Sequence, residues 1–336
     1  MRLDPAVAAV RLAVRRALED LGVSDPVPVL VACSGGADSL ALLAATVFEA
    51  RRTQWQVVGV TVDHGLQSRS ADRAASVVEQ MAALGAHQTV PVRVEVIPSG
   101  QGLEAAAREA RYAALADVAQ RARSDVILLG HTLDDQAETV LLGLTRGSGG
   151  RSIAGMRRRS PPFSRPLLDV TRAQTEAACR SEGIDFWSDP HNDDLRFTRA
   201  RVRHVVLPLL ERELGPGIAG ALARTADQLR DDADALDAEA DHALSELRTP
   251  RGLVVAALGQ LPTAVRRRVL RRVAVEAGSP PSELFRVHVV AMDELVHSYS
   301  GQRWVELPGH VRVTRENGEL RCRRTGGTEP RPPVAG

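Results

Sequence analysis

The sequence predicts an α/β fold in which a parallel sheet carries helices on both faces, followed by a mostly helical C-terminal domain. Three observations support this prediction. Apolar, strand-like runs alternate with segments of helical period up to about residue 150. A glycine-rich stretch directly follows the first of these runs and opens a helix. Beyond Pro216 the sequence becomes strongly helical.

The first part of the chain begins with an amphipathic helix, DPAVAAVRLAVRRALEDLG. Strand-like runs follow at 27–33, 56–63, 89–96 and 125–130, and helical segments lie near 38–52, 70–85 and 103–123. This alternation indicates βαβ units with parallel strands. Ligands of such sheets bind beyond the carboxyl ends of the strands, where the strand order reverses. Three strand ends carry polar signatures, SGGADS, DHG and HTLDDQAET, so we expect these three to converge.

The pattern changes after about residue 150. The stretch RGSGGRSIAGMRRRSPPFSRP is typical of a loop or hinge, and a helix is expected near 171–183. The chain closes with a predicted hairpin, HVRVTRENGELRCRR, because Asn317-Gly318 favours a tight turn. We therefore expect a first domain over 1–215 with its core at about 25–150, a mainly helical accessory domain over 216–326, and a disordered tail over 327–336.

Composition excludes several classes of protein. All 43 basic residues are arginine, so the chain cannot form a Walker-type ATPase, a protein kinase or a lysine Schiff base. Cys33, Cys179 and Cys322 lie far apart, which argues against a zinc site, an iron–sulfur cluster and a disulfide framework. The net charge of +1 means that nucleic-acid binding must depend on local arginine clusters. No apolar run approaches the roughly 18 residues of a membrane span, so we expect a cytoplasmic protein without membrane contact.

The stretch SGGADS predicts an anion site. Backbone amides at a helix N-terminus lack partners, and the helix dipole is positive there. The alternative is a tight turn in which glycine only supplies unusual backbone angles. Asp38 favours the anion site, because a carboxylate beside phosphates implies Mg²⁺ carried in with a nucleotide.

Two further stretches carry charged residues at helical spacing. Asp134 and Asp135 open a helix and Glu138 lies one turn later, either as partners of the helix dipole or as a cluster that holds Mg²⁺ and a substrate ammonium. The segment 191–208 carries arginines that form either a solvated face or a phosphate-binding surface, namely Arg196, Arg199, Arg201 and Arg203, with His204 and Phe197 beside them. A second run, Arg266, Arg267, Arg268, Arg271 and Arg272, is left open between RNA contact and solvated face.

These motifs together resemble the tRNA(Ile)-lysidine synthase family of the PP-loop (N-type) ATP pyrophosphatases, whose core is Rossmann-like. The matching stretches are SGGADS, VDHGL, GHTLDDQAETVLLGLTRGSG, SRPLL and DPHNDDLRFTRARVRHVVLPLL, over roughly residues 28–210. The resemblance implies a C–N ligase. Such an enzyme would use ATP and Mg²⁺ to adenylate the C2 oxygen of the wobble cytidine (position 34) of tRNA(Ile) with a CAU anticodon. The ε-amine of free L-lysine would then attack C2 and displace AMP.

The resemblance also implies roles for individual residues. Asp38, Asp134, Asp135, Glu138, Arg201 and Arg203 would be catalytic, with Asp38 as the Mg²⁺ ligand and with Asp135 and Glu138 binding lysine. ATP would be bound by Ser34, Gly35, Gly36, Ala37, Asp38, Ser39, Asp63, His64, Gly130 and His131. The tRNA would be bound by Arg196, Arg199, Arg201 and Arg203. Two residues depart from the family pattern: Thr132 stands where many members carry histidine, and Ala200 where many carry asparagine.

Other hypotheses remain at this stage. Another PP-loop enzyme, such as a tRNA thiolase or a small-molecule amidotransferase, would need reactive cysteines, cluster ligands or a glutaminase partner, and the sequence shows none of these. A non-catalytic ATP-binding module would have no use for the acidic triplet. Whether the protein is a monomer or a homodimer is left open by the sequence.

Overall fold

The structure is a computed structural model that describes residues 3–22, 27–53, 55–65, 69–96, 102–146, 150–189, 193–299, 301 and 304–325. The predicted tail at 327–336, Leu66 and residues 190–192 lie outside these ranges. The chain divides into two compact units, one made of residues 1–145 and 155–226, the other of residues 146–154 and 227–336. Each unit is described separately.

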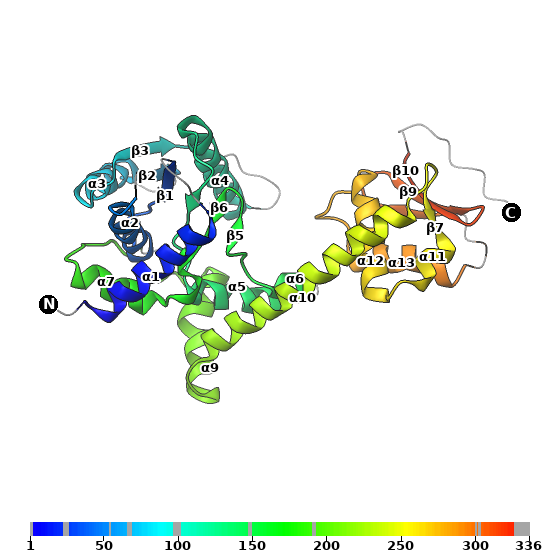
Figure 1. Cartoon of the computed structure of the whole chain (residues 1–336). Helices are drawn as coiled ribbons and strands as arrows, with labels where there is room; N and C mark the ends of the chain where they lie inside the picture. Colours follow the sequence, from blue (N-terminus) through cyan, green and yellow to red (C-terminus); the bar gives the residue numbers. More distant parts are fainter. Residues whose placement is uncertain are drawn as a thin grey trace. The chain divides into compact units, whose positions relative to one another are not determined.

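The first unit is built on a six-stranded sheet with the order β3-β2-β1-β4-β6-β5 (Figure 1). The pairs β1 with β2, β2 with β3, β1 with β4, and β4 with β6 are parallel, whereas β5 and β6 are antiparallel. The strands are β1 (Pro28–Ala32), β2 (Gln56–Asp63), β3 (Gln88–Arg93), β4 (Ile127–Leu128), β5 (Arg159–Ser160) and β6 (Phe163–Ser164). The predicted fold class is confirmed.

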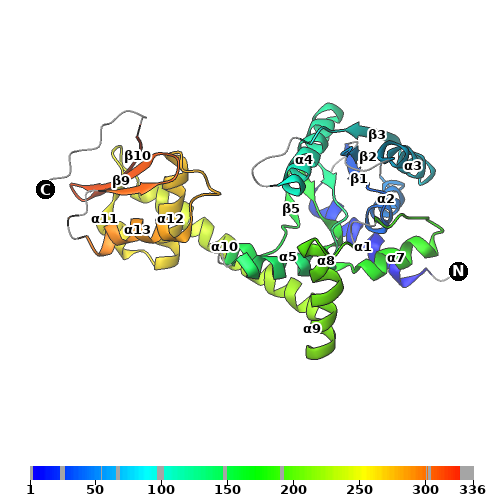
Figure 2. The ribbon, with the colours of Figure 1, turned by 180° about the vertical axis from the view of Figure 1, so that it is seen from behind.

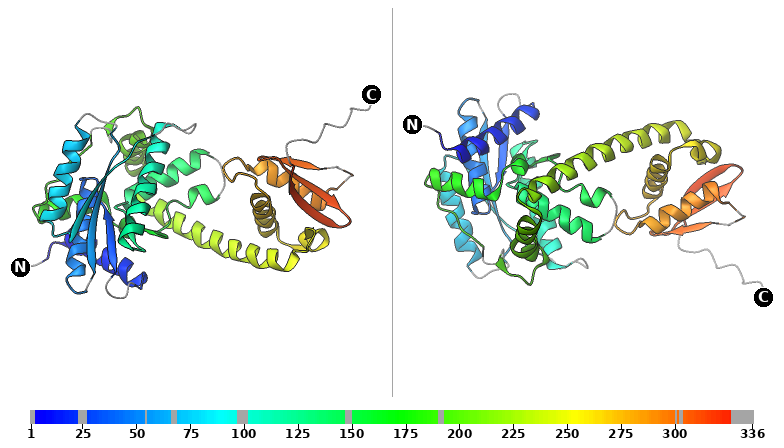
Figure 3. Two further views of the ribbon diagram at one scale, coloured as in Figure 1. Left: turned by 90° about the horizontal axis from the view of Figure 1, so that it is seen from above. Right: turned by 90° about the horizontal axis from the view of Figure 1, so that it is seen from below.

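Helices cover both faces of this sheet, as the strands drawn between helices in Figure 3 show. The helices are α1 (Pro5–Asp20), α2 (Ala37–Ala50), α3 (Ser70–Ala83), α4 (Leu103–Ala122), α5 (Leu133–Arg146), α7 (Arg172–Ser181), α8 (Thr198–Arg201) and α9 (Leu207–Leu214), with a 3₁₀ turn η1 (Pro166–Asp169) and a π-helical turn η3 (Val202–Val206). Alternation along β1 assigns the faces: Val29 and Val31 pack with α1, α2, α3 and α7, and Leu30 packs with α4.

The N-terminal helix shows why these segments fold as they do. The Asp4 side chain accepts a hydrogen bond from the Ala6 N–H at 2.8 Å, and Pro5 occupies the first helical position. Helical spacing places the buried residues on one face, and these are Val7, Val10, Val14 and Leu18. Each buried side chain contributes roughly 1.5 to 3 kcal/mol of transfer free energy, so this face fixes α1 on the sheet.

The strand order reverses next to β1, because β2 and β3 lie on one side of it and β4 lies on the other. The carboxyl ends of β1 and β4 therefore flank the point where an α/β sheet binds its ligand. Gly130 permits a close approach there, since a Cβ on it would lie 3.0 Å from the Asp38 carbonyl oxygen. The chain after β4 thus contacts the first turn of α2.

The second unit combines helices with a four-stranded antiparallel sheet of order β7-β10-β9-β8. Its elements are α6 (Gly150–Ile153), β7 (Leu253–Val254), α11 (Val255–Gln260), α12 (Thr263–Glu276), α13 (Arg286–His297), β8 (Val305–Leu307), β9 (Val311–Glu316) and β10 (Glu319–Arg324). The division between the two units falls within α10 (Ile218–Leu247). The predicted hairpin is confirmed: Asn317 and Gly318 turn from β9 to β10 with φ of 50° and 77°.

Two parts of the chain differ from the expectations. The stretch expected to be only loop or hinge contains β5 and β6, and the predicted hairpin is joined by β7 and β8. These are pairings of two or three residues, which carry too short a pattern to be detected in a sequence. Among the described helices, none is both long and apolar enough to cross a bilayer.

Candidate active site

The loop between β1 and α2 presents backbone amides with no internal partner. Within the described chain, the N–H groups of residues 35–38 donate to no protein acceptor. The Ser39 hydroxyl holds the loop from inside, since it accepts from the Ser34 N–H at 3.1 Å and donates to the Gly36 carbonyl at 2.9 Å. Orphan amides at a helix N-terminus attract anions. The geometry is that of a phosphate-binding loop.

Asp38 lies in the first turn of α2, beside this loop. One of its carboxylate oxygens accepts a short hydrogen bond from the Thr175 hydroxyl, and the other lies 3.7 Å from Arg172 Nε. Burial raises the pKa of Asp38 to about 6, against the opposing effects of Thr175 and Arg172. A cation bound beside this partly buried carboxylate would stabilise its ionised form and lower its pKa.

Helix α5 supplies two further buried carboxylates. One oxygen of Asp135 accepts from the N–H and the hydroxyl of Thr132, at 2.9 and 3.1 Å. The Thr132 hydroxyl oxygen in turn accepts from the Asp135 N–H at 3.4 Å, so Thr132 is the N-cap of the helix. Burial opposes ionisation of Asp135, but the Arg172 and Arg199 guanidinium groups lower its pKa. Glu138, one turn later, is fully buried. Both carboxylates are held among arginines.

Three guanidinium groups surround these carboxylates. Arg199 Nε donates to Glu138 at 2.8 Å, and Arg203 Nε donates to it at 2.7 Å. Arg203 also reaches Asp135 at 3.3 Å. The spacing of four residues puts both arginines on one face, and the π-helical turn η3 carries Arg203. Such turns are frequent at functional sites.

Arg172 joins the two halves of the site. Its Nη2 lies 3.0 Å from Asp135 and 3.6 Å from Glu138, and its Nε faces Asp38. The sequence analysis missed this residue, although a signal was present. Arg172 stands in the first turn of α7, where the helix dipole disfavours a cation, so an arginine there indicates a specific anionic partner.

Not every predicted residue joins this cluster. Asp134 accepts from the backbone N–H of Arg172 at 2.8 Å and thereby caps α7. Arg196 pairs with Asp194, and Arg201 donates to the carbonyls of residues 195 and 196, both at 2.9 Å. Of the four predicted tRNA-binding arginines, Arg199 and Arg203 face the carboxylates, while the side chains of Arg196 and Arg201 are exposed.

A second group of polar residues lies beyond the ends of β2 and β4. Four atoms of this group are buried and have no hydrogen-bond partner in the described structure, namely Nδ1 of His64, Nδ1 of His131, Nε of Arg111 and Nε of Arg165. Burial, together with Arg165 and Arg111, lowers the pKa of His131 to about 3. Burial also lowers the pKa of Arg111. A bound anion would relieve this unmatched positive charge.

Asp63 lies at the same edge of the sheet. It accepts from the Gly65 N–H at 2.8 Å, and this hydrogen bond and one from Ser70 lower its pKa despite the opposing effect of burial. The strand ends SGGADS, DHG and HTLDDQAET thus all present polar groups beyond the sheet, on the carboxyl side of β1, β2 and β4. The ribbon of β1, β2 and α2 can be followed in Figure 2.

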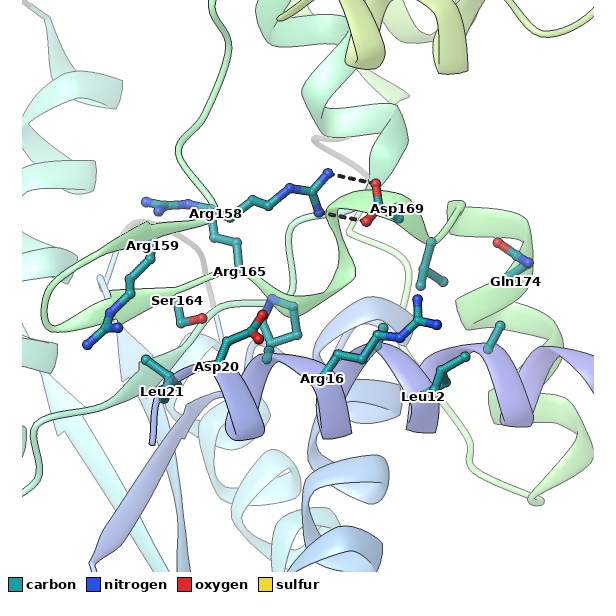
Figure 4. Close-up of a pocket in the computed structure, with 15 residues that line it drawn as sticks. Leu12, Arg16, Asp20, Leu21, Arg158, Arg159, Ser164, Arg165, Asp169 and Gln174 are labelled. Atoms are coloured by element: carbon teal, nitrogen blue, oxygen red, sulfur yellow. Dashed lines mark hydrogen bonds and ion pairs between the residues drawn. The ribbon is translucent and has the colours of Figure 1, made fainter. Parts of the chain in front are cut away.

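A cavity of about 470 Å³ lies in this unit between α1, the β5–β6 hairpin and η1, and it shares Arg165 with the group around His131. Figure 4 shows its wall, where Arg158 binds Asp169 through two hydrogen bonds of 2.6 and 2.7 Å. None of the predicted site residues lines it. The candidate site is therefore the cluster at the strand ends.

The residues present fit a Mg²⁺ ion that arrives with a nucleotide. No group of three or more His, Cys, Asp or Glu side chains in the described ranges forms a metal cage. Mg²⁺ that accompanies a nucleotide needs only one or two carboxylates, because phosphate oxygens and waters complete its shell. Asp38 beside the orphan amides meets that requirement.

Comparisons with known proteins agree with this geometry. Residues 10–210 match the family model of the PP-loop domain, and residues 253–321 match that of the TilS substrate binding domain. The fold resembles the U34-tRNA thiolase NcsA from Methanococcus maripaludis, with a TM-score of 0.55 at 16% identity, over 67% of this chain and 79% of that one. The chain is therefore an ATP-using protein of the PP-loop class.

Its relatives define the class more narrowly. The tRNA(Ile)-lysidine synthase of Thermobifida fusca is 54% identical over 94% of this chain and 97% of its own length. That of Streptomyces coelicolor is 48% identical over 95% and 99%. The chain belongs to the tRNA(Ile)-lysidine synthase family.

Proposed function

We propose that this protein converts the wobble cytidine (position 34) of tRNA(Ile) with a CAU anticodon to lysidine, using ATP and free L-lysine. The C2 oxygen of the cytidine attacks the α-phosphate of ATP and releases pyrophosphate. The lysine ε-amine then attacks C2, AMP leaves, and the amine loses its proton. The observation that carries this proposal is the Arg172 guanidinium, which links Asp38 of the phosphate loop to Asp135 and Glu138.

The first step depends on the phosphate loop. We propose that the N–H groups of residues 35–38 bind the pyrophosphate and that Asp38 binds Mg²⁺. The Mg²⁺ ion would neutralise charge on the phosphates. We assign the four orphan nitrogens around His131 and Arg111 to a phosphate of ATP. Neutral His131 can donate or accept one hydrogen bond there without bringing in a further charge.

The second step needs a site for a cation that can lose a proton. Three carboxylates, Asp38, Asp135 and Glu138, face three guanidinium groups, those of Arg172, Arg199 and Arg203, so the charges of these six groups balance when all are ionised. A lysine ammonium must therefore take over a carboxylate from one of the guanidinium groups. We place the lysine ammonium beside Asp135 and Glu138, where a carboxylate can also accept its proton.

The arginines then divide by position. Arg203, packed between Glu138 and Asp135, is suited to stabilise charge that develops at the reacting cytidine. Exposed Arg196 and Arg201 are suited to the RNA backbone. We assign the chemistry to residues 1–215 and further tRNA contacts to residues 216–326. Because its substrate is tRNA, we place the protein in the cytoplasm.

The test measures AMP release from ATP with purified tRNA(Ile) bearing CAU, with and without lysine. We expect AMP release to depend on both, with one lysine incorporated per AMP. A tRNA with uridine at the wobble position is the matched control. AMP release without lysine incorporation, or lysine incorporation into the control, would contradict the proposal. A non-catalytic module would bind ATP and release no pyrophosphate.

The thiolase of similar fold carries a [4Fe-4S] cluster, so the cysteines of this chain bear on the choice between the two reactions. Cys33 and Cys179 are buried, and burial raises the pKa of each thiol to about 12. Burial likewise raises the pKa of Cys322, in β10 of the second unit, to about 12. Thiols of this kind are poor nucleophiles near neutral pH. The cysteines therefore favour the lysidine reaction over thiolation.

A further inference from the structure

A short irregular segment after α7, residues 182–189, contacts the phosphate loop. The backbone N–H of Trp187 donates to the carbonyl of Gly35 at 3.0 Å. Gln80 on α3 donates to the Asp185 carbonyl at 2.8 Å, which holds the same segment from the other side. The guanidinium of Arg73, also on α3, stacks over the Trp187 ring at 3.4 Å from its centroid.

This hydrogen bond fixes the orientation of one peptide group. In a trans peptide the C=O of one residue and the N–H of the next point in opposite directions. Because the Gly35 carbonyl points toward Trp187, the Gly36 N–H points away from it. That N–H is one of the amides with no protein acceptor in the described chain. The hydrogen bond from Trp187 thus fixes the direction of an amide that is available to bind an anion.

Within the loop, the Ser39 hydroxyl bonds the Ser34 N–H and the Gly36 carbonyl, which belong to peptides before and after the one that joins Gly35 to Gly36. Gly35 has a φ of +84°, and a Cβ on it would lie 2.7 Å from Val77 Cγ2, so only glycine fits. A glycine peptide is also the easiest to rotate, which is a disadvantage in a site that depends on preorganised dipoles. An external hydrogen bond that fixes this peptide removes the disadvantage.

We propose that Trp187, clamped by Arg73, is a positioning residue for the pyrophosphate-binding loop. Its backbone N–H orients the Gly36 amide, and its ring, held under the guanidinium, keeps the segment against the loop. The carboxylates of α5, Asp135 and Glu138, are bound by a different set of guanidinium groups, those of Arg172, Arg199 and Arg203. The inference rests on the proposed function only in naming pyrophosphate as the ligand.

The test compares three variants in the full-length protein. Trp187→Pro removes both the N–H and the ring, whereas Trp187→Leu and Arg73→Gln weaken the clamp and keep the N–H. The matched controls are Trp304→Leu and Arg312→Gln, because Arg312 stacks over Trp304 at 4.4 Å in the second unit. Calorimetric titration with magnesium pyrophosphate measures the loop without any catalysis. The KM values for ATP and lysine, the tRNA affinity and the thermal midpoint complete the set.

We expect Trp187→Leu and Arg73→Gln to weaken pyrophosphate binding and raise the KM for ATP by about 3- to 10-fold, the range of a partly desolvated cation–π contact. Trp187→Pro should cost about 10- to 100-fold, somewhat less than the complete loss of an oriented donor. The KM for lysine and the tRNA affinity should stay within about 2-fold, because an amide dipole acts only at short range. Both control variants should match wild type in pyrophosphate affinity.

Two results would overturn the inference. One is wild-type pyrophosphate affinity in Trp187→Leu and Arg73→Gln, which decides the matter even where Trp187→Pro does not fold. The other is an equal loss of pyrophosphate, lysine and tRNA binding together with a lower thermal midpoint, which would show a purely structural role. Failure of the proposed function is distinguishable, since wild type would then bind pyrophosphate yet form no lysidine.

Discussion

Replacing Asp38 by asparagine should make the protein more stable and inactive at once. In the folded protein Asp38 is largely buried, and its pKa rises from 3.8 to about 6. A carboxyl group with a raised pKa is bound to its proton more tightly in the folded state than in the unfolded state. Ionising it at neutral pH therefore costs folding free energy, and the neutral amide of the Asp38→Asn variant avoids that cost.

The shift of about 2 pKa units corresponds to about 3 kcal/mol as an upper limit. The asparagine oxygen can still accept from Thr175, but Arg172 loses a partial partner at 3.7 Å. We therefore expect a net gain of about 1 to 2 kcal/mol at pH 7 to 8.

The pH dependence follows from the same linkage. Protonated Asp38 stabilises wild type below about pH 4, and this contribution is lost as the pH rises through about 6. The stability difference between variant and wild type should thus grow from pH 4 to 6 and stay constant above about 7. Comparing the two proteins at each pH cancels the titration of other groups.

Ligand binding should reverse the order of stability of wild type and the Asp38→Asn variant. Magnesium pyrophosphate should stabilise wild type by about 2.7 kcal/mol at 100 times its dissociation constant, and Asp38→Asn far less. Adenylation should fall by about two to three decades, the usual effect of losing one preorganised charge contact.

Urea unfolding at several pH values, with and without magnesium pyrophosphate, tests both the pH-dependent stability and the stabilisation by the ligand. A variant that is less stable than wild type at pH 8, or a difference independent of pH between 4 and 7, would refute the electrostatic reasoning. Retained ligand stabilisation would refute the Mg²⁺ assignment.

Three further predictions concern the arginine and carboxylate pairs. Glu138→Gln should slow lysine transfer more than tRNA adenylation, measured by trapping the adenylated tRNA, and equal losses would assign Glu138 to holding Arg203 alone. Arg203→Ala should lower the single-turnover rate of adenylation, because Arg203 faces the carboxylates. Arg201→Ala should instead weaken tRNA binding and reduce the slope of log affinity against log salt concentration by roughly 0.7 to 0.9. Identical behaviour of the two variants would contradict their different placement. Arg266→Ala should destabilise the second unit by about 3 kcal/mol in urea unfolding and leave tRNA affinity unchanged. The reason is that Arg266 forms a buried ion pair of 2.6 Å with Asp293. Reduced tRNA affinity without destabilisation would indicate an RNA contact instead.

The arginine run at residues 266–272 shows that a charge pattern in the sequence does not reveal the partners of the side chains. From the sequence, RNA contact and a solvated face were both open for Arg266 and its neighbours. The structure shows side chains held within their own unit: Arg266 and Arg267 bind Asp293, while Arg268 and Arg272 bind Asp237. Their acidic partners lie about 25 to 35 residues away in sequence, so no local pattern could have indicated them.

The fold was largely predictable because its main signals are local. Strands such as β2 carry a continuous apolar run, and α2 follows its glycine loop directly. The polar strand ends could be placed together because parallel strands share one edge. What the sequence could not show is which groups pair. Arg172, Arg111 and Arg165 enter the site from three different elements, and tertiary packing alone brings them together.

The absence of lysine from all 336 residues bears on the proposed chemistry, because no lysine side chain of the protein can act as a competing nucleophile. An adenylated cytidine is an electrophile, and a neutral amine beside it would compete with the substrate for C2. Every cation in the described cluster is a guanidinium, which stays protonated near neutral pH and is not a nucleophile there. The arginines can therefore hold carboxylates and phosphates without entering the reaction. Under the proposed function the attacking amine comes from free lysine. Asp135 and Glu138 would then bind its ammonium in competition with three guanidinium groups, and this exchange of partners would be the central requirement of the second step.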